Sequence, residues 1–349
     1  MLQANVDRRR VCVSLATIVI AACDQPRQRL IENDLKDAWR SALPKVVTSG
    51  DGTLLATIQP SADARSSELL TLRDRSIKHQ LTAPNGGSLI SPALSVDGRT
   101  IAAIELHPLS PLFSIILFRD GAYVRSIFTS TDGILDLALD ETSRRLAFTR
   151  YIGSLQIDLF EIDIATGAIS RFGPPGIGYL TVYDLSYQDD DTLTFIGVQG
   201  NEKNFHFRPN VHASTGAALG SHQPFVQRRG EQPLAFIPPR AGRLETNIDQ
   251  MCAGYFGNRK DFFFVEDSLE TVGVDGSFDY EAFTLDEHGE RKQVTDLRAA
   301  SMYVSFASHA RTLAVSHVGA KLDHAFYLTV VSLDTGRIVT TLIVQLFQG

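Results

Sequence analysis

The chain has 349 residues and a mass of 38.3 kDa, with 44% hydrophobic and 21% charged side chains, as in a globular protein. Glycine and proline contribute 26 and 14 residues, which excludes collagen-like and wholly disordered classes. The formal net charge is −7, and no cluster of lysine or arginine follows Arg10. A body of this charge repels a phosphate backbone, so we expect no nucleic-acid partner.

Residues 1–22 have the layout of a secretory signal peptide. Three arginines, Arg8 to Arg10, precede the run Val11 to Ala22, which is apolar apart from one serine and one threonine. As a helix this run would be about 18 Å long, too short to cross roughly 30 Å of hydrocarbon. We therefore predict that the segment is cleaved.

The predicted cleavage site, Ile20-Ala21-Ala22-Cys23, resembles the bacterial lipobox. The resemblance implies that Cys23 is diacylated on sulfur, becomes the new N-terminus and anchors the chain in a membrane facing the periplasm. Asp24 resembles an inner-membrane retention signal, with the outer membrane as the alternative. An ordinary signal peptide followed by a chance cysteine is the other interpretation.

The two remaining cysteines predict no disulfide framework. Cys12 would leave with the signal peptide, and Cys252 would be the one unmodified thiol in the mature chain. No histidine motif accompanies Cys252, so a buried, hydrophobic role is favoured over a nucleophilic one.

Residues 23–45 are predicted to form a lipidated tether and a short amphipathic helix. Apolar side chains recur at helical spacing until Pro44 ends the pattern; they are Ile31, Leu35, Ala38, Trp39, Ala42 and Leu43. This stripe is expected to dock on the body of the protein, with a membrane or a partner as alternatives.

The rest of the chain repeats a unit of two polar turns between short alternating strands. The clearest copy contains Asp97-Gly98 as its first turn and Asp120-Gly121 as its second. Further first turns are expected at Asp51-Gly52, Thr142-Ser143, Asp189-Asp190 and His309-Ala310. Further second turns are expected at Asp74-Arg75, Thr166-Gly167, Thr215-Gly216, His288-Gly289 and Thr335-Gly336.

Six copies follow from these second turns, at intervals of 46, 46, 49, 73 and 47 residues, and the longest interval contains an insertion. A four-stranded antiparallel sheet of about 46 residues is one propeller blade, and it hides its apolar faces only by packing in a closed ring. We predict an all-β fold: a six-bladed β-propeller over residues 46–347, preceded by the short N-terminal helix.

The segment Leu94-Ser95-Val96-Asp97-Gly98-Arg99-Thr100-Ile101-Ala102 resembles the core of the TolB-like (WD40-like) propeller repeat, which also occurs in relatives of prolyl oligopeptidase. The resemblance implies the fold. The chain contains no G-x-S-x-G motif for a hydrolase nucleophile. The spacing of His206, His212 and His222 matches no common metal site, so no metal and no cofactor are expected.

Two carboxylates, Asp136 and Asp184, are expected near the start of the innermost strands of blades three and four, with Ser91 at the like position in blade two. Carboxylates that converge on a channel mouth bind Ca²⁺ or a cationic ligand group. Lactonase-like propellers use such a ring, but the Asn and Glu residues that they add have no match at these positions. The alternative is that both carboxylates cap backbone amides.

The insertion is placed between Pro238 and Lys260, and it mixes residue types that are enriched at interfaces. Its candidate binding residues are Arg240, Arg243, Tyr255, Phe256 and Arg259. An Ω-loop or an irregular inner strand of blade five is the structural alternative.

Together these features favour a membrane-anchored, non-catalytic module that binds a protein partner of the cell envelope as a monomer. The alternative is a propeller hydrolase or lyase that acts at the channel mouth through Asp136 and Asp184.

Overall fold

The computed structural model describes residues 45–61, 66–74, 76–108, 110–152, 156–175, 177–189, 191–199, 223–235, 248–255, 262–267, 280–286, 290–307, 311–319 and 325–345. Every regular element among them is a β-strand, and no helix long and apolar enough to cross a membrane occurs in these ranges. The helix predicted before Pro44 lies outside the described residues.

The strands follow one another in antiparallel meanders of four. The first meander contains β1 (Val46–Thr48), β2 (Leu54–Pro60), β3 (Ser67–Arg73) and β4 (Ser76–Leu81). The second contains β5 (Ser88–Leu94), β6 (Thr100–Leu106), β7 (Phe113–Arg119) and β8 (Ala122–Ser130). The third contains β9 (Ile134–Leu139), β10 (Arg145–Tyr151), β11 (Ile157–Asp163) and β12 (Ile169–Arg171). The fourth contains β13 (Tyr179–Asp189), β14 (Thr192–Gln199), β15 (Gln223–Arg228) and β16 (Leu234–Ala235). The fifth contains β17 (Ile248–Tyr255), β18 (Phe262–Asp267), β19 (Tyr280–Leu285) and β20 (Arg291–Gln293). The sixth contains β21 (Ala299–Ala307), β22 (Thr312–Gly319), β23 (Ala325–Ser332) and β24 (Ile338–Gln345).

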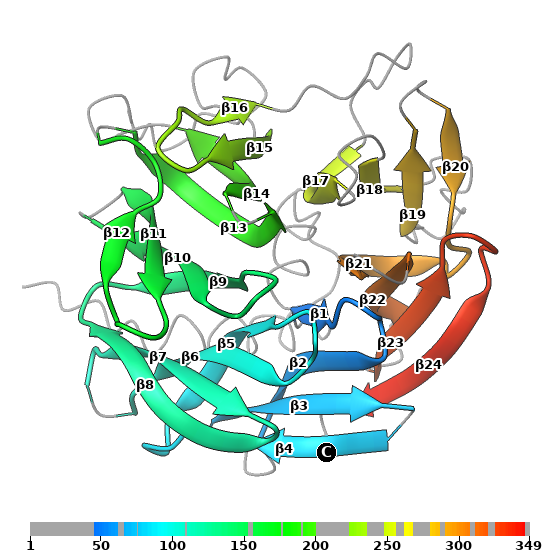
Figure 1. Ribbon diagram of the computed structural model, residues 1–349. Helices are drawn as coiled ribbons and strands as arrows, with labels where there is room; N and C mark the ends of the chain where they lie inside the picture. The colour runs from blue at the N-terminus through cyan, green and yellow to red at the C-terminus, as the bar shows by residue number, and fades with distance from the viewer. Residues whose placement is uncertain are drawn as a thin grey trace, which may run out of the picture.

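Figure 1 shows these meanders side by side in a ring, with the first strand of each nearest the centre and the fourth at the rim. The predicted fold class, an all-β propeller with four-stranded antiparallel blades, is confirmed.

The predicted count of six blades needs correction, because the hydrogen-bonded sheets of the described strands are fewer than six. The described strands form four sheets, two of four strands and two of eight. Each eight-stranded sheet is two meanders joined by a single residue pair, Ile157 with Tyr179 or Tyr280 with Ala299. The reason is that the third strand of one meander comes within pairing distance of the first strand of the next.

Alternating apolar residues of neighbouring meanders pack face to face, so the core is a series of layers between them. One layer joins β5–β8 to β9–β12 and contains Ile104 and Ile115 against Leu137 and Phe148, all fully or almost fully buried. Such a face would be exposed in an isolated meander, because only the next meander covers it.

The ring closes through side chains, because each meander consists of consecutive strands. Val46 and Leu70 of the first meander share a core with Ala314, Leu328 and Val330 of the last. No strand is exchanged across this seam among the described residues.

In the first two meanders, a Ser-x-Asp-Gly sequence explains the turn between the first and second strands. The Ser95 hydroxyl donates to Asp97 at 2.6 Å and accepts from the Thr100 amide at 2.9 Å, while Asp97 also accepts from the Arg99 amide at 3.0 Å. Gly98 follows with φ of 71°, a conformation in which a side chain is strained. The first meander repeats these contacts around Asp51.

The predicted turns at Thr142-Ser143, Thr166-Gly167 and Thr335-Gly336 also lie between paired strands, and Ser143, Gly167 and Gly336 have positive φ. The turns at His288-Gly289 and His309-Ala310 lie outside the described residues.

The predicted second turn at Thr215-Gly216 is wrong. The turn between the third and fourth strands of its meander lies at Arg229-Gly230, where Gly230 has φ of 77°. Extra length therefore lies between the ends of β14 and β15, at residues 200–222, as well as between β16 and β17. Both dipeptides offer a glycine for the turn, and strand pairing selects the second.

Candidate functional site

The inner strands β5 and β13 contain an irregularity where the sequence places Ser91 and Asp184. The register of β5 shifts between Ile90 and Ala93, and that of β13 shifts between Tyr183 and Ser186. Ser91 and Asp184 lie in these shifts with φ of 47° and 57°. For a residue other than glycine this backbone costs about 1–2 kcal/mol, so surrounding contacts must hold it.

Both irregularities flank Asp136 of β9, a residue that is almost completely buried, with 3% of its surface exposed. Its Oδ2 atom accepts from the Leu185 amide at 2.8 Å. Its Oδ1 atom accepts from the Leu137 amide at 2.9 Å and from the Ser91 hydroxyl at 3.3 Å. The left-handed residues thus bring donors from two other meanders to one carboxylate.

A fourth group completes the contacts of Asp136. The ammonium of Lys45 forms a salt bridge with Oδ1 of Asp136 and lies 3.4 Å from the Leu137 carbonyl oxygen. The single hydrogen of the Ser91 hydroxyl is shared between Asp136 and the Leu135 carbonyl oxygen, and the carbonyl is the nearer acceptor at 2.7 Å. The first four meanders therefore meet at a single side chain.

The two predicted carboxylates, Asp136 and Asp184, have different surroundings. Asp136 caps the Leu137 and Leu185 amides, as the structural alternative requires, and it also binds Lys45. Asp184 is half-buried and has polar interactions of its own. In the described ranges no three His, Cys, Asp or Glu side chains gather closely enough to hold a metal ion.

The insertion is not a loop throughout. Residues 248–255 form β17, the innermost strand of its meander, and Tyr255 pairs with Phe262 of β18 at the backbone. The inner-strand alternative therefore applies to this part of the segment. Arg240, Arg243, Phe256 and Arg259 lie outside the described residues, as do Cys23 and His206, His212 and His222.

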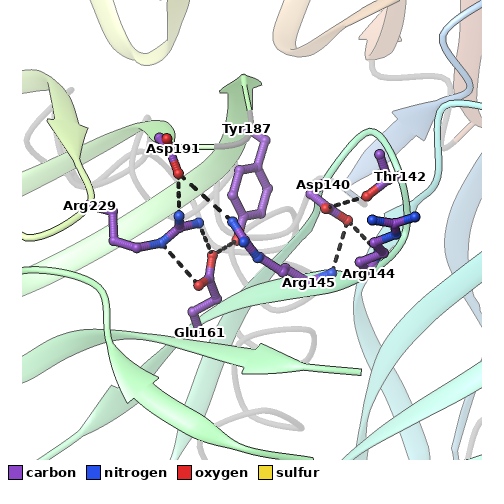
Figure 2. A network of polar contacts seen from close by, with 8 residues as sticks. All are labelled: Asp140, Thr142, Arg144, Arg145, Glu161, Tyr187, Asp191 and Arg229. Carbon is purple, nitrogen blue, oxygen red and sulfur yellow. Dashed lines mark hydrogen bonds and ion pairs between the residues drawn. The ribbon is translucent and has the colours of Figure 1, made fainter. Parts of the chain in front are cut away.

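Sequence reasoning missed a polar network between the β9–β12 and β13–β16 meanders (Figure 2). At its centre Glu161 of β11 accepts from the Tyr187 hydroxyl at 2.7 Å and from two guanidinium nitrogens of Arg229 at 2.7 and 3.1 Å. Arg229 also forms an ion pair with Asp191, which lies 3.8 Å from the guanidinium of Arg145.

The charges in this network are matched. Burial raises the pKa of Tyr187, and the charge of Glu161 and the hydrogen bond to it raise it further, so the hydroxyl stays a donor. Burial alone lowers the pKa of Arg229, but Glu161 and Asp191 raise it above its ordinary value. Glu161 and Arg229 therefore bind each other between the two meanders, and the Tyr187 hydroxyl donates to the same carboxylate.

Hydrogen bonds to a carboxylate also fix the turn between β9 and β10, which lies beside this network. Asp140 accepts from the Arg144 and Arg145 amides at 2.8 and 3.0 Å and from the Thr142 hydroxyl at 2.8 Å (Figure 2). Nothing in the local sequence distinguishes Glu161 or Arg229 from solvated charges, because their partners lie in other strands.

Comparison with known proteins places the fold. No family model matches the sequence, and no curated protein matches it. Among solved structures, TolB from Acinetobacter baumannii is similar with a TM-score of 0.56 and 14% identity, over 90% of this chain and 68% of that chain. The chain thus has a TolB-like β-propeller fold.

Two further structures are similar at lower scores. The β-propeller domain of the Trilobed protease from Pyrococcus furiosus has a TM-score of 0.46 and 11% identity, over 88% of this chain and 98% of that chain. A chain of the nidogen/laminin complex has a TM-score of 0.49 and 12% identity, over 83% and 92%.

Proposed function

We propose that this chain, whose fold is a TolB-like β-propeller, is a lipoprotein of the bacterial cell envelope that binds a protein partner and catalyses no reaction. Its anchor is a diacylated Cys23, and its body faces the periplasm as a monomer. Asp24 favours the inner membrane. The proposal for the anchor rests on the sequence alone, since Cys23 precedes the described residues.

The observation that carries binding rather than catalysis is the state of Asp136. A general base or metal ligand needs a lone pair directed at substrate or metal. Here Oδ2 accepts from the Leu185 amide, and Oδ1 accepts from Lys45, Ser91 and Leu137. A carboxylate committed in this way supports the ring, and a rigid ring displays segments at fixed positions for recognition.

The proposed partner contacts are Arg240, Arg243, Tyr255, Phe256 and Arg259. The support is compositional: arginine and aromatic residues are enriched where proteins meet, and this stretch is basic while the chain as a whole is acidic. A partner with an acidic surface fits this composition.

The test is recovery of partners from crosslinked membranes by the tagged full-length chain. Deletion of residues 239–259 is unsuitable, because it removes β17. The variant is instead Arg240→Ser with Arg243→Ser. The matched control is Arg119→Ser with Arg228→Ser, which removes the same charge from two exposed positions.

The proposal expects the control to recover the same partner as the unchanged chain, and the variant to lose most of it. Equal recovery by variant and control would remove this segment from the binding surface. A turnover by the purified chain that Asp184→Asn abolishes would replace binding with the enzyme alternative.

A further inference from the structure

Lys45 reaches the inner strands of the ring from a position outside them. It precedes β1, yet its ammonium reaches Asp136, 91 residues further along the chain. Its side chain retains 15% of its exposure, whereas that of Asp136 retains 5%. The carboxylate of Asp136 is therefore more deeply buried than the side chain of Lys45.

The acceptors that face the ammonium belong to one strand and are held by its neighbours. Oδ1 of Asp136 and the Leu137 carbonyl oxygen of β9 both lie within reach of the lysine nitrogen. Ser91 of β5 and the Leu185 amide of β13 fix the carboxylate from either side. The two strained residues Ser91 and Asp184 lie at these flanking positions. Three strands therefore preorganise the acceptors independently of Lys45.

The arrangement favours an ammonium over a guanidinium. Arginine binds a carboxylate best through two parallel hydrogen bonds, one to each oxygen. In this site Oδ2 accepts from the Leu185 amide, so one oxygen and one carbonyl face the incoming cation. A compact cation with several N–H donors satisfies both acceptors, as a lysine ammonium does.

We propose that β5, β9 and β13 form a binding site for a primary ammonium group on a short alkyl chain, and that Lys45 is its internal occupant. When the ammonium of Lys45 is removed by substitution, the site takes the same group from solution. The inference depends on neither the lipid anchor nor the 238–260 segment, so their failure would leave it standing.

The test replaces Lys45 by alanine, which removes three carbons and the ammonium, and supplies n-propylammonium to the purified chain. A ligand that binds only the folded state raises the melting temperature with its concentration. We expect a saturable rise of about 2 °C or more in Lys45→Ala, and no rise in the unchanged chain, whose site is occupied. Tetramethylammonium, which has no N–H donor, is the control for unspecific salt effects.

The matched control variant is Lys45→Ala with Asp136→Asn, which lacks the carboxylate. A response to n-propylammonium that is equal in this double variant, or absent in Lys45→Ala, overturns the site. Spermidine at equal concentration is the control for ligand size and charge: a stronger response than that to n-propylammonium overturns the preference for a single ammonium on a short alkyl chain.

A second variant keeps the proposal testable if Lys45→Ala does not fold. Lys45→Arg retains the charge and the length, and Lys45→Met retains the length alone. We expect the melting temperature of Lys45→Arg to lie nearer that of Lys45→Met than that of the unchanged chain. An arginine variant as stable as the unchanged chain overturns the preference for an ammonium.

Discussion

Lys45 and Asp136 form a salt bridge between the residue that enters the first strand and the inner strand of the third meander. The same carboxylate accepts from the Ser91 hydroxyl and the Leu185 amide, so it links the second and fourth meanders as well. A single buried side chain thus sets how four consecutive meanders meet at the centre of the ring.

Asp136→Asn is predicted to destabilise the fold strongly. The amide presents an NH₂ group to one of the surrounding donors and leaves the Lys45 ammonium without its counter-charge. Breaking one partner of a buried ion pair costs about 3–5 kcal/mol, and we expect about 3, because Lys45 is partly exposed and finds water. Denaturant unfolding measures the change.

The control is Asp120→Asn, which removes a carboxylate from the exposed pair with Arg99. It should leave stability unchanged, because water and salt screen such a pair. Similar losses in both variants would show that Asp136 has no special role in the ring.

Gly121→Ala is predicted to cost more than Gly167→Ala. Both glycines have positive φ, 82° and 74°, so each alanine is strained by about 1 kcal/mol or more. At Gly121 the new methyl group would also overlap Nδ1 of His79 on the neighbouring meander, whereas nothing lies within 4 Å at Gly167.

The second substitution His79→Ala isolates that contact. It should recover part of the loss in Gly121→Ala and leave the loss in Gly167→Ala unchanged, as measured by melting temperatures of the three single and two double variants. Equal losses in both glycine variants would mean that the outer strand moves away without cost.

Asp158→Asn is predicted to change how stability depends on pH. Burial raises the pKa of Asp158 in the folded chain despite the nearby charges of Arg171 and Arg150, so the folded state binds this proton more tightly than the unfolded state. Its contribution is fully present below the unfolded pKa of 3.8 and is lost as pH rises through the folded value.

Relative to the asparagine variant, the unchanged chain should therefore lose stability as pH rises above 3.8. Urea unfolding of both chains at closely spaced pH values from the acid limit to neutrality measures the difference. A difference that grows in favour of the unchanged chain would contradict the direction of the shift.

Tyr187→Phe and Arg229→Met are predicted to be coupled. Both hydroxyl and guanidinium bind Oε1 of Glu161 at 2.7 Å, and a hydrogen bond to a charged group contributes about 1.5–3 kcal/mol. The double variant should therefore differ from the sum of the single variants by about 0.5 kcal/mol or more.

Tyr187→Phe combined with Arg311→Met is the additive control, because Arg311 pairs with Asp334 in the last meander. Unfolding free energies of all five variants complete the two cycles. Additivity in both would show that the network in Figure 2 does not act as a unit.

Cys23→Ser is predicted to release the body from membranes, because the thiol is the atom that lipidation uses. Fractionation of cells should move the variant to the soluble envelope fraction, and mass spectrometry of the unchanged chain should find a diacylglycerol adduct at Cys23. An unmodified N-terminus elsewhere in the chain would exclude the lipoprotein.

The sequence by itself determined the repeat, the strand alternation and most of the turns. These features are local: a period of two selects a strand face, and Gly98, Gly121 and Gly336 supply the positive φ that their turns need. The resemblance of residues 94–102 to the TolB-like repeat pointed to the same fold.

Only the tertiary structure decided which polar residues meet. Lys45 and Asp136 are 91 residues apart, and Arg229 and Glu161 are 68 apart. Strand pairing also chose Arg229-Gly230 over Thr215-Gly216 as a turn and made residues 248–255 a strand. The physical reason is that both carboxylates receive donors from other meanders, and the positions of those donors are fixed by closure of the ring rather than by adjacent residues.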